Sequence, residues 1–187
     1  AARTRAMSAG EIAARLDGGH LLARGARTAQ PRHQSLAAAI DWSYRLLDEP
    51  EQRMFARMSV LAGGADLAAG HAVCGEPGTS PAASLDRVAA LVDKSMVVAD
   101  EQAGVTRYRM LETLRAYARD RGEAPARRHA EYFVGLAETA ARGVHGPDER
   151  AWIEATLPNT DSLRAAFEYA FAERDADLAL RLVAALP

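Results

Sequence analysis

The stretch from Arg107 to Ala118, RYRMLETLRAYA, decides the fold because an alternating strand passes in it directly into an amphipathic helix. Arg107 and Arg109 share one face of the strand, and Tyr108 and Met110 share the other, by the two-residue period of a strand. One face is therefore expected to be wet or to face a partner, and the other to lie on the core.

The residues before this stretch predict the rest of a β-hairpin and a helix beneath it. Ser95 to Asp100 reads as a first strand, DEQAG turns the chain, and Val105 to Met110 returns as the second strand. A two-stranded hairpin alone is marginal in water, so it needs helices to rest on. The helix expected to begin near Pro81 has a core face made of Leu85, Val88, Leu91 and Val92.

Three more helices are expected upstream. The first runs from Ser35 to Leu47, and its apolar face is wide enough to predict burial against several neighbours. That face comprises Leu36, Ala39, Ile40, Trp42, Ser43, Tyr44, Leu46 and Leu47.

The second of these helices is capped by Asp48, carries Pro50 and Glu51 in its first turn and is ended by Gly63-Gly64. Its core face is Met54, Phe55, Met58 and Leu61. The third is capped by Asp66, stops at Gly75 and carries Leu67, Val73 and Cys74. Helices followed by a hairpin and one more helix is the order of a winged helix, which we assign to residues 34–122.

The remaining residues, 123–187, predict Ala-rich helices without a further strand. The expected segments are Pro125 to Arg142, Asp148 to Leu157 around Trp152 and Ile153, one capped by Asn159 or Thr160, and one opened by Asp175. The third of them carries Leu163, Phe167, Ala170 and Phe171, and the last carries Leu178, Leu182 and Leu186. Small residues allow paired helices to approach closely, as in a tetratricopeptide-like array. The predicted fold class is therefore mainly α: a winged-helix-like bundle with one β-hairpin, then tetratricopeptide-like helical hairpins.

Composition narrows the functional classes. A formal net charge of -2 gives the chain no general attraction for a polyanion. The single cysteine, Cys74, rules out an intramolecular disulfide and favours a reducing compartment, so we expect a cytoplasmic protein. No apolar run is long enough for a membrane helix. The absence of an initiator Met and an end inside a helical pattern predict a fragment of a longer protein.

Catalytic and metal-binding motifs are not evident in the sequence. A phosphate-binding loop needs the pattern GxxxxGK[ST], and Lys94-Ser95 lacks the upstream glycines. His71 and Cys74 have a spacing that could ligate a metal, but no third ligand is evident, so a buried structural cysteine is the simpler interpretation. We therefore predict no enzyme activity, no catalytic or metal-binding residue and no cofactor on this chain.

The helix that would read DNA in a winged helix carries Arg87 and Lys94, but also Asp86 and Asp93, which would repel phosphates. The Arg127-Arg128-His129 triplet at the start of the first C-terminal helix predicts a solvated face or an inter-domain salt-bridge donor.

The order of four segments resembles a known family. RHQSLAAAIDWSYRLL, LVDKSMVV, RYRMLETLRAYA and RRHAEYFVGLAE together are similar to actinobacterial regulators of the SARP (AfsR-like) and large LuxR types. In those proteins a STAND ATPase of the NB-ARC type precedes a winged helix and tetratricopeptide-like repeats. The resemblance implies that residues 1–33, with a short helix from Ser8 to Leu16 and a polar linker, end the helical domain of the ATPase.

The resemblance also implies a site. Related NB-ARC proteins carry a Met-His-Asp triplet after the wing, whose histidine touches the β-phosphate of ADP. The matching positions are Met110, Leu111 and Glu112, so the nucleotide-sensing histidine is replaced by Leu111. The candidate inter-domain contacts are then Arg107, Arg109, Leu111 and Glu112, and ATP or ADP would bind only to the parent protein.

The resemblance implies a regulatory fragment that couples domains of a transcription regulator. Its partners would be its own nucleotide-binding domain and a protein or small-molecule effector on the helical array, with DNA bound only through another domain and no membrane contact. Two alternatives stay open: a winged helix that binds DNA directly, and a helical-repeat adaptor for a protein or peptide.

Overall fold

The computed structural model describes residues 31–102, 104–142 and 156–185. It divides into two compact units, residues 1–46 and residues 47–187, and each is described by itself. The predicted helix from Ser8 to Leu16, the segment around Trp152 and Ile153, and Leu186 lie outside the described residues.

In the first unit the described element is helix α2, Pro31–Arg45, which begins four residues before the predicted start. An ion pair joins Asp41 and Arg45 one turn apart, with the atoms 2.8 Å from each other. Ile40 is buried, but Leu36, Trp42 and Leu46 are exposed. The prediction of a uniformly buried face is therefore wrong for these three side chains, because an apolar stripe does not specify what covers it.

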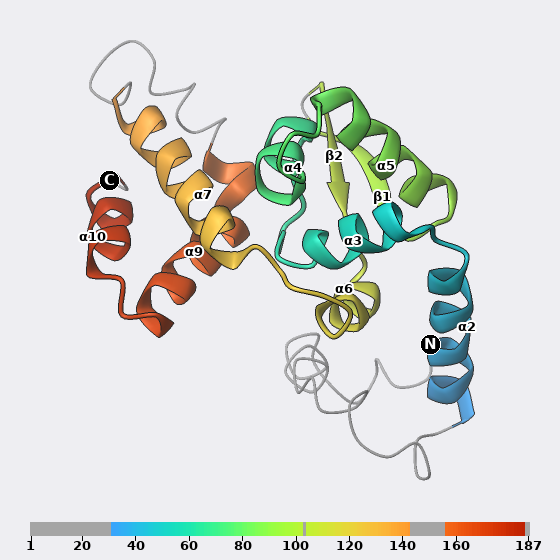
Figure 1. Ribbon diagram of the computed structural model, residues 1–187. Helices are drawn as coiled ribbons and strands as arrows, with labels where there is room; N and C mark the ends of the chain where they lie inside the picture. The colour runs from blue at the N-terminus through green and yellow to red at the C-terminus, as the bar shows by residue number, and fades with distance from the viewer. Residues whose placement is uncertain (1–30, 103, 143–155, 186–187) are drawn as a thin grey trace, which may run out of the picture. The chain divides into compact units, whose positions relative to one another are not determined.

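The second unit begins with helix α3, Glu49–Met58 (Figure 1). Its predicted cap at Asp48 is confirmed. The Asp48 carboxylate accepts a hydrogen bond from the Glu51 N–H, and the Glu51 carboxylate accepts one from the Asp48 N–H. Met54, Phe55 and Met58 are buried as predicted. The helix ends at Met58 rather than at Gly63, because Ser59 to Ala65 form turns that lead to a contact with the hairpin.

Helix α4, Leu67–Cys74, has the predicted cap at Asp66 and the predicted end at Gly75. Helix α5, Pro81–Asp93, buries Val88 and Leu91 as predicted. Its Leu85 is exposed instead, and Ser84 takes the buried position. Burial of a hydroxyl is tolerated there because Ser84 Oγ lies 2.8 Å from His71 Nδ1, within hydrogen-bond distance.

Strands β1, Val98–Gln102, and β2, Val105–Arg109, form the predicted antiparallel hairpin, with Asp100 opposite Arg107. The other edge of β2 pairs with Ala65, because Ala65 and Tyr108 exchange two backbone hydrogen bonds of 2.9 and 2.7 Å. The hairpin is thereby tied to the turn between α3 and α4.

Helix α6, Glu112–Arg119, follows β2 after Met110 and Leu111, so two residues separate a strand and a helix predicted to be continuous. It packs on α3, where the rings of Phe55 and Tyr117 lie 6.5 Å apart. The corner from strand to helix is therefore built on the core of the helical bundle.

The C-terminal helices are α7, Ala126–Ala141, α9, Thr160–Ala172, and α10, Ala176–Ala185, with a short 3-10 helix, η1, Leu157–Asn159, before α9. They pack on one another, and their contacts include the fully buried small residues Ala130, Ala137, Ala166 and Ala170. Phe167 and Phe171 were predicted on the core face of α9 but are exposed, Phe171 by 77%. The buried positions of α9 are Ser162, Leu163, Ala166 and Ala170, so small residues make most of its closest contacts.

These elements confirm the predicted fold class: a mainly helical chain in which helices precede a two-stranded hairpin and further helices follow it. Among the described residues, no helix is long and apolar enough to cross a membrane.

His129 on α7 makes folding of the second unit dependent on pH. Its ring is buried beside Phe133, with centroids 4.7 Å apart, and no hydrogen-bond partner is found for Nε2 among the described residues. Burial lowers the pKa of His129 from 6.5 to about 4. Between these values the unfolded chain binds a proton that the folded chain does not, so stability falls as the pH falls through this window.

We therefore expect His129 to account for a loss of about 2 kcal/mol in the free energy of unfolding between pH 7 and pH 5. Urea denaturation at the two pH values measures it in the wild type and in His129→Leu. The His129→Leu variant should not show this pH-dependent loss, whatever its absolute stability. If its pH dependence equals that of the wild type, His129 is not the cause of the loss.

Candidate functional site

Arg107 points into the protein from the hairpin. Its side chain is only 7% exposed, and its Nη2 group donates hydrogen bonds to the carbonyl oxygens of Gly64 and Pro158 and to Oδ1 of Asn159, at 2.9 to 3.0 Å. Gly64 belongs to the turn before α4, whereas Pro158 and Asn159 lie in η1 at the start of α9. This residue, a candidate inter-domain contact, therefore joins β2 to the C-terminal helices.

The other three candidate residues lie away from that contact. Arg109 forms an ion pair with Asp100 across the hairpin, with Nε and Oδ2 separated by 2.6 Å. Leu111 is 48% exposed at the start of α6, where it provides no side-chain cap. Glu112 accepts a hydrogen bond from Arg115 within its own helix. The four residues thus do not converge on one site.

The turn from Gly63 to Asp66 brings the hairpin and the C-terminal helices together. Gly64 has a φ of 77°, and a Cβ atom there would lie 2.8 Å from the carbonyl oxygen of Tyr108. A Cβ atom on Gly63 would lie 3.1 Å from Cβ of Asp161 in α9. Both glycines therefore permit the close approach of segments that are distant in the sequence.

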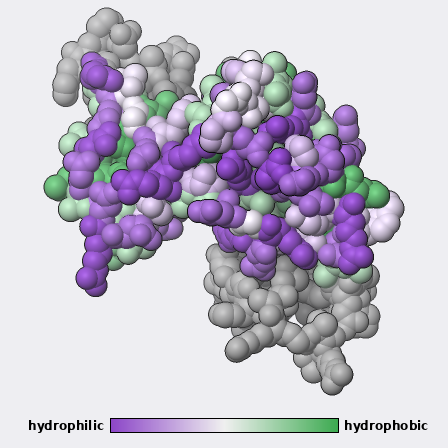
Figure 2. Space-filling view, viewed as in Figure 1, coloured by the Kyte–Doolittle hydropathy of each residue, from purple (hydrophilic) through white to green (hydrophobic). Residues whose placement is uncertain are grey.

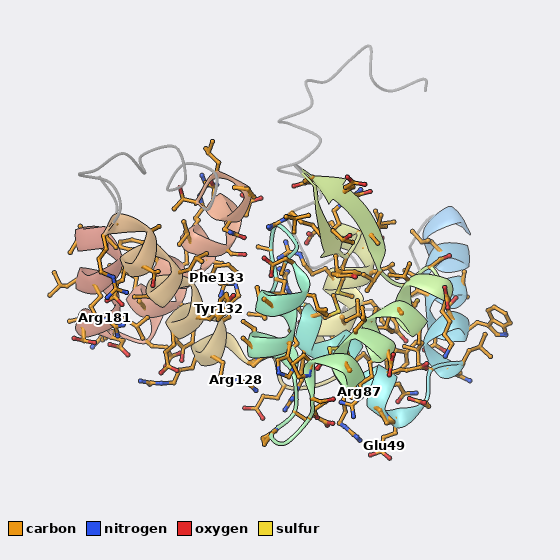
Figure 3. The ribbon with its side chains drawn as sticks, turned by 90° about the horizontal axis from the view of Figure 1, so that it is seen from above. Glu49, Arg87, Arg128, Tyr132, Phe133 and Arg181 are labelled. Atoms are coloured by element: carbon orange, nitrogen blue, oxygen red, sulfur yellow. The ribbon has the colours of Figure 1, made fainter. Side chains whose placement is uncertain are left out.

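Arg128 makes a second connection, between α7 and the carboxyl end of α4. Its guanidinium donates hydrogen bonds to the carbonyl oxygens of Ala72 and Gly75, the second at 2.8 Å. Figure 3 shows Arg128 at the part of α7 nearest to α4. A cation at a helix carboxyl end is favourable because the last carbonyl groups lack partners and carry partial negative charge.

The hydrogen-bond acceptors of Arg107 and Arg128 were not predicted from the sequence. Asn159 was predicted to be a helix cap, and Arg128 was predicted to be solvated or to form a salt bridge. Arg107 and Arg128 donate mainly to backbone carbonyl groups, which every residue carries, so no pattern of residue types could reveal these pairs.

His71 and Cys74 have the spacing of possible metal ligands. Among the described residues no cluster of three metal-ligating side chains is found, and His71 is engaged with Ser84. Burial raises the pKa of the Cys74 thiol to about 12, so the sulfur is protonated and unreactive at neutral pH.

Comparison with known proteins identifies the region around the hairpin. Residues 47–123 match the family model described as a winged helix-turn-helix domain. Residues 47–123 are therefore similar to a winged helix-turn-helix domain, and this name is used for them from here on. No solved structure matches the chain.

Relatives occur in mycobacteria. The chain is 44% identical over its whole length to proteins of Mycobacterium tuberculosis and Mycobacterium bovis that bear the name "Putative HTH-type transcriptional regulator". It spans about a fifth, 22%, of their length. An uncharacterized protein of M. tuberculosis is 39% identical over 67% of the chain, which spans 34% of that relative.

In the winged helix-turn-helix domain, α5 is the third helix, and both of its cations are paired within the domain. Arg87 forms an ion pair with Glu76 at 2.8 Å, and Lys94 forms one with Glu51 at 2.5 Å. Arg53 donates a hydrogen bond to Glu76, and with Arg87 it holds the pKa of that carboxyl below its usual value. Figure 3 shows Arg87 and Glu49 on the same side of the domain.

The outward side of α5 therefore offers carboxylates and apolar groups instead of cations. Its exposed side chains include Ala82, Leu85, Asp86, Ala89 and Asp93. Figure 2 shows mainly hydrophilic side chains on the visible face and hydrophobic ones toward its edges. One of these edges is formed by α10, where Leu180 and Val183 are exposed. A DNA backbone is attracted by free cations, which this face of α5 lacks.

Glu51 connects the cap of α3 to Lys94 at the end of α5, so its removal should destabilise the domain. We expect Glu51→Ala to lower the free energy of unfolding by about 2 kcal/mol, because it removes a cap hydrogen bond and an ion pair of a buried carboxylate. Urea denaturation measures the loss.

Two variants serve as controls. Glu49→Ala removes a carboxylate that is 83% exposed and paired with Arg53, and should cost less than about 0.5 kcal/mol. Glu51→Gln keeps an acceptor for the Asp48 N–H and should fall between the two. If Glu49→Ala and Glu51→Ala lower the free energy of unfolding equally, the cap hydrogen bond and the ion pair of Glu51 contribute nothing to stability.

Proposed function

We propose that the chain is an inter-domain coupling segment of a STAND-class transcription regulator, and that its winged helix-turn-helix domain acts by contacting protein. The observation that carries the proposal is the outward side of α5, where Asp86 and Asp93 flank apolar side chains while Arg87 and Lys94 are paired internally. Such a surface suits a protein partner better than a polyanion.

The relatives support the regulatory part of the proposal. Mycobacterial proteins several times longer than this chain carry the name "Putative HTH-type transcriptional regulator". We propose that this chain likewise belongs to a longer protein, the parent, which has further domains. The partner that we propose is the nucleotide-binding domain of the same protein, in which ADP and ATP would favour different contacts with the winged helix-turn-helix domain. A ligand shifts such an equilibrium only through a difference in affinity between the two states.

In this proposal the chain itself neither binds nucleotide nor catalyses a reaction. The residue at the nucleotide-sensing position of the family is Leu111, which offers no hydrogen-bond donor from its side chain. Glu112 beside it carries a negative charge, which opposes the approach of a phosphate.

Direct DNA binding is the second candidate function, and it is favoured by the family model itself, since helix-turn-helix domains commonly place a helix in the major groove. Peptide binding by the C-terminal helices is a third, supported by the exposed side chains of Phe171, Leu180 and Val183.

Titration of this chain with three ligands separates the first two of these functions. We expect the isolated nucleotide-binding domain of the parent to bind with a dissociation constant that differs between its ADP and ATP forms. We expect no heat from ADP or ATP alone in calorimetry. We also expect no anisotropy change with a generic fluorescent duplex at low salt, where non-specific binders bind more tightly than their dissociation constants of about 1–100 μM at physiological salt.

The double variant Asp86→Arg with Asp93→Arg is the matched control, because it puts two cations on α5 and should increase duplex binding. Salt-dependent duplex binding by the wild type would favour the second candidate. Micromolar binding of ADP or ATP to this chain, or equal affinity for both forms of the nucleotide-binding domain, would overturn the proposal.

A further inference from the structure

Arg107 occupies an unusual position for a residue on the hairpin of a winged helix-turn-helix domain. Such a hairpin can present cations to solvent, as Arg109 does with a side chain that is 44% exposed. Arg107 instead donates to acceptors in the turn before α4 and in η1 before α9. These acceptors are 43 to 52 residues away from Arg107 in the sequence. We call these three hydrogen bonds the Arg107 contact.

The turn from Gly63 to Asp66 makes the Arg107 contact sensitive to movement. It pairs with β2 through Ala65 and Tyr108 and supplies the Gly64 carbonyl to Arg107. Its Gly63 leaves so little space beside Asp161 of α9 that an added Cβ atom would lie 3.1 Å from Cβ of Asp161. A displacement of the start of α9 would therefore disturb the turn and the hairpin together.

The acceptors of the Arg107 contact are two carbonyl groups and an amide oxygen, all of them neutral. Asp66 attracts the guanidinium electrostatically, while burial opposes its charged form and lowers the pKa of Arg107. The cation also lies at the amino end of α9, where the helix dipole is unfavourable to positive charge. Burial and the helix dipole therefore weaken the net stabilisation that the three hydrogen bonds provide.

We propose that the Arg107 contact couples the C-terminal helices to the hairpin of the winged helix-turn-helix domain. Binding to either of these parts then changes the stability of the other. Arg107 is in this sense a positioning residue for the hairpin. The inference concerns contacts within this chain, and it stands whether or not the parent is a nucleotide-dependent regulator.

Hydrogen exchange measured by mass spectrometry on the whole chain tests the coupling. In Arg107→Ala, amide exchange in residues 157–172 and in the hairpin should accelerate by about tenfold or more, because hydrogen bonds from a charged donor are lost. Exchange in α5 should stay unchanged. Arg109→Ala is the matched control: it removes an arginine from the same strand and should leave residues 157–172 unaffected.

Variants at Asn159 test the contact from its other side and remain informative if Arg107→Ala fails to fold. Asn159→Ala should accelerate exchange in the hairpin, to which Asn159 does not belong. Asn159→Asp should slow it, because a carboxylate strengthens the pairing with Arg107. Unchanged hairpin exchange in both Asn159 variants, or equal effects of Arg107→Ala and Arg109→Ala on residues 157–172, would overturn the proposal.

Discussion

The structure of residues 47–187 depends on the pairing of β2 with the turn before α4. Two backbone hydrogen bonds between Ala65 and Tyr108 extend the hairpin by one residue pair and hold it against the helical core. That pairing places the Gly64 carbonyl within reach of Arg107, and Gly63 against Asp161. Without it the hairpin would be a two-stranded ribbon, which is marginally stable in water, and the C-terminal helices would lose their contact with it.

Arginine side chains carry out this assembly by donating to backbone groups. Arg107 donates to the carbonyl groups of Gly64 and Pro158, and Arg128 donates to those of Ala72 and Gly75 at the end of α4. A planar guanidinium has five N–H donors, so one side chain can satisfy acceptors from two segments at once. Lys94, the only lysine, is likewise used internally, in its ion pair with Glu51. Cations that could have formed a DNA-binding surface instead stabilise the fold, which is consistent with a domain that works through protein contacts.

Sequence reasoning succeeded where the determinant is local. Asp48, Asp66 and Asp175 each accept a hydrogen bond from the backbone three residues later, and all three helix starts were predicted. It failed for Leu85, Phe167 and Phe171, which belong to apolar stripes but are exposed. A helical period gives the width of a stripe, but small residues such as Ser84 and Ala166 can take the closest contact and leave larger neighbours outside.

The amino-acid sequence by itself determined the order of helices and hairpin, the helix caps at Asp48, Asp66 and Asp175, and the absence of a phosphate-binding loop, because these depend on residues within a few positions of each other. Only the tertiary structure decided that Arg107 is buried while Arg109 is not, although the two occupy equivalent positions on one strand face. The reason is physical: the partners of Arg107 are carbonyl and amide oxygens brought from Gly64, Pro158 and Asn159 by the packing of distant helices. A pattern of residue types cannot predict which carbonyl groups come together on folding, because every residue has one.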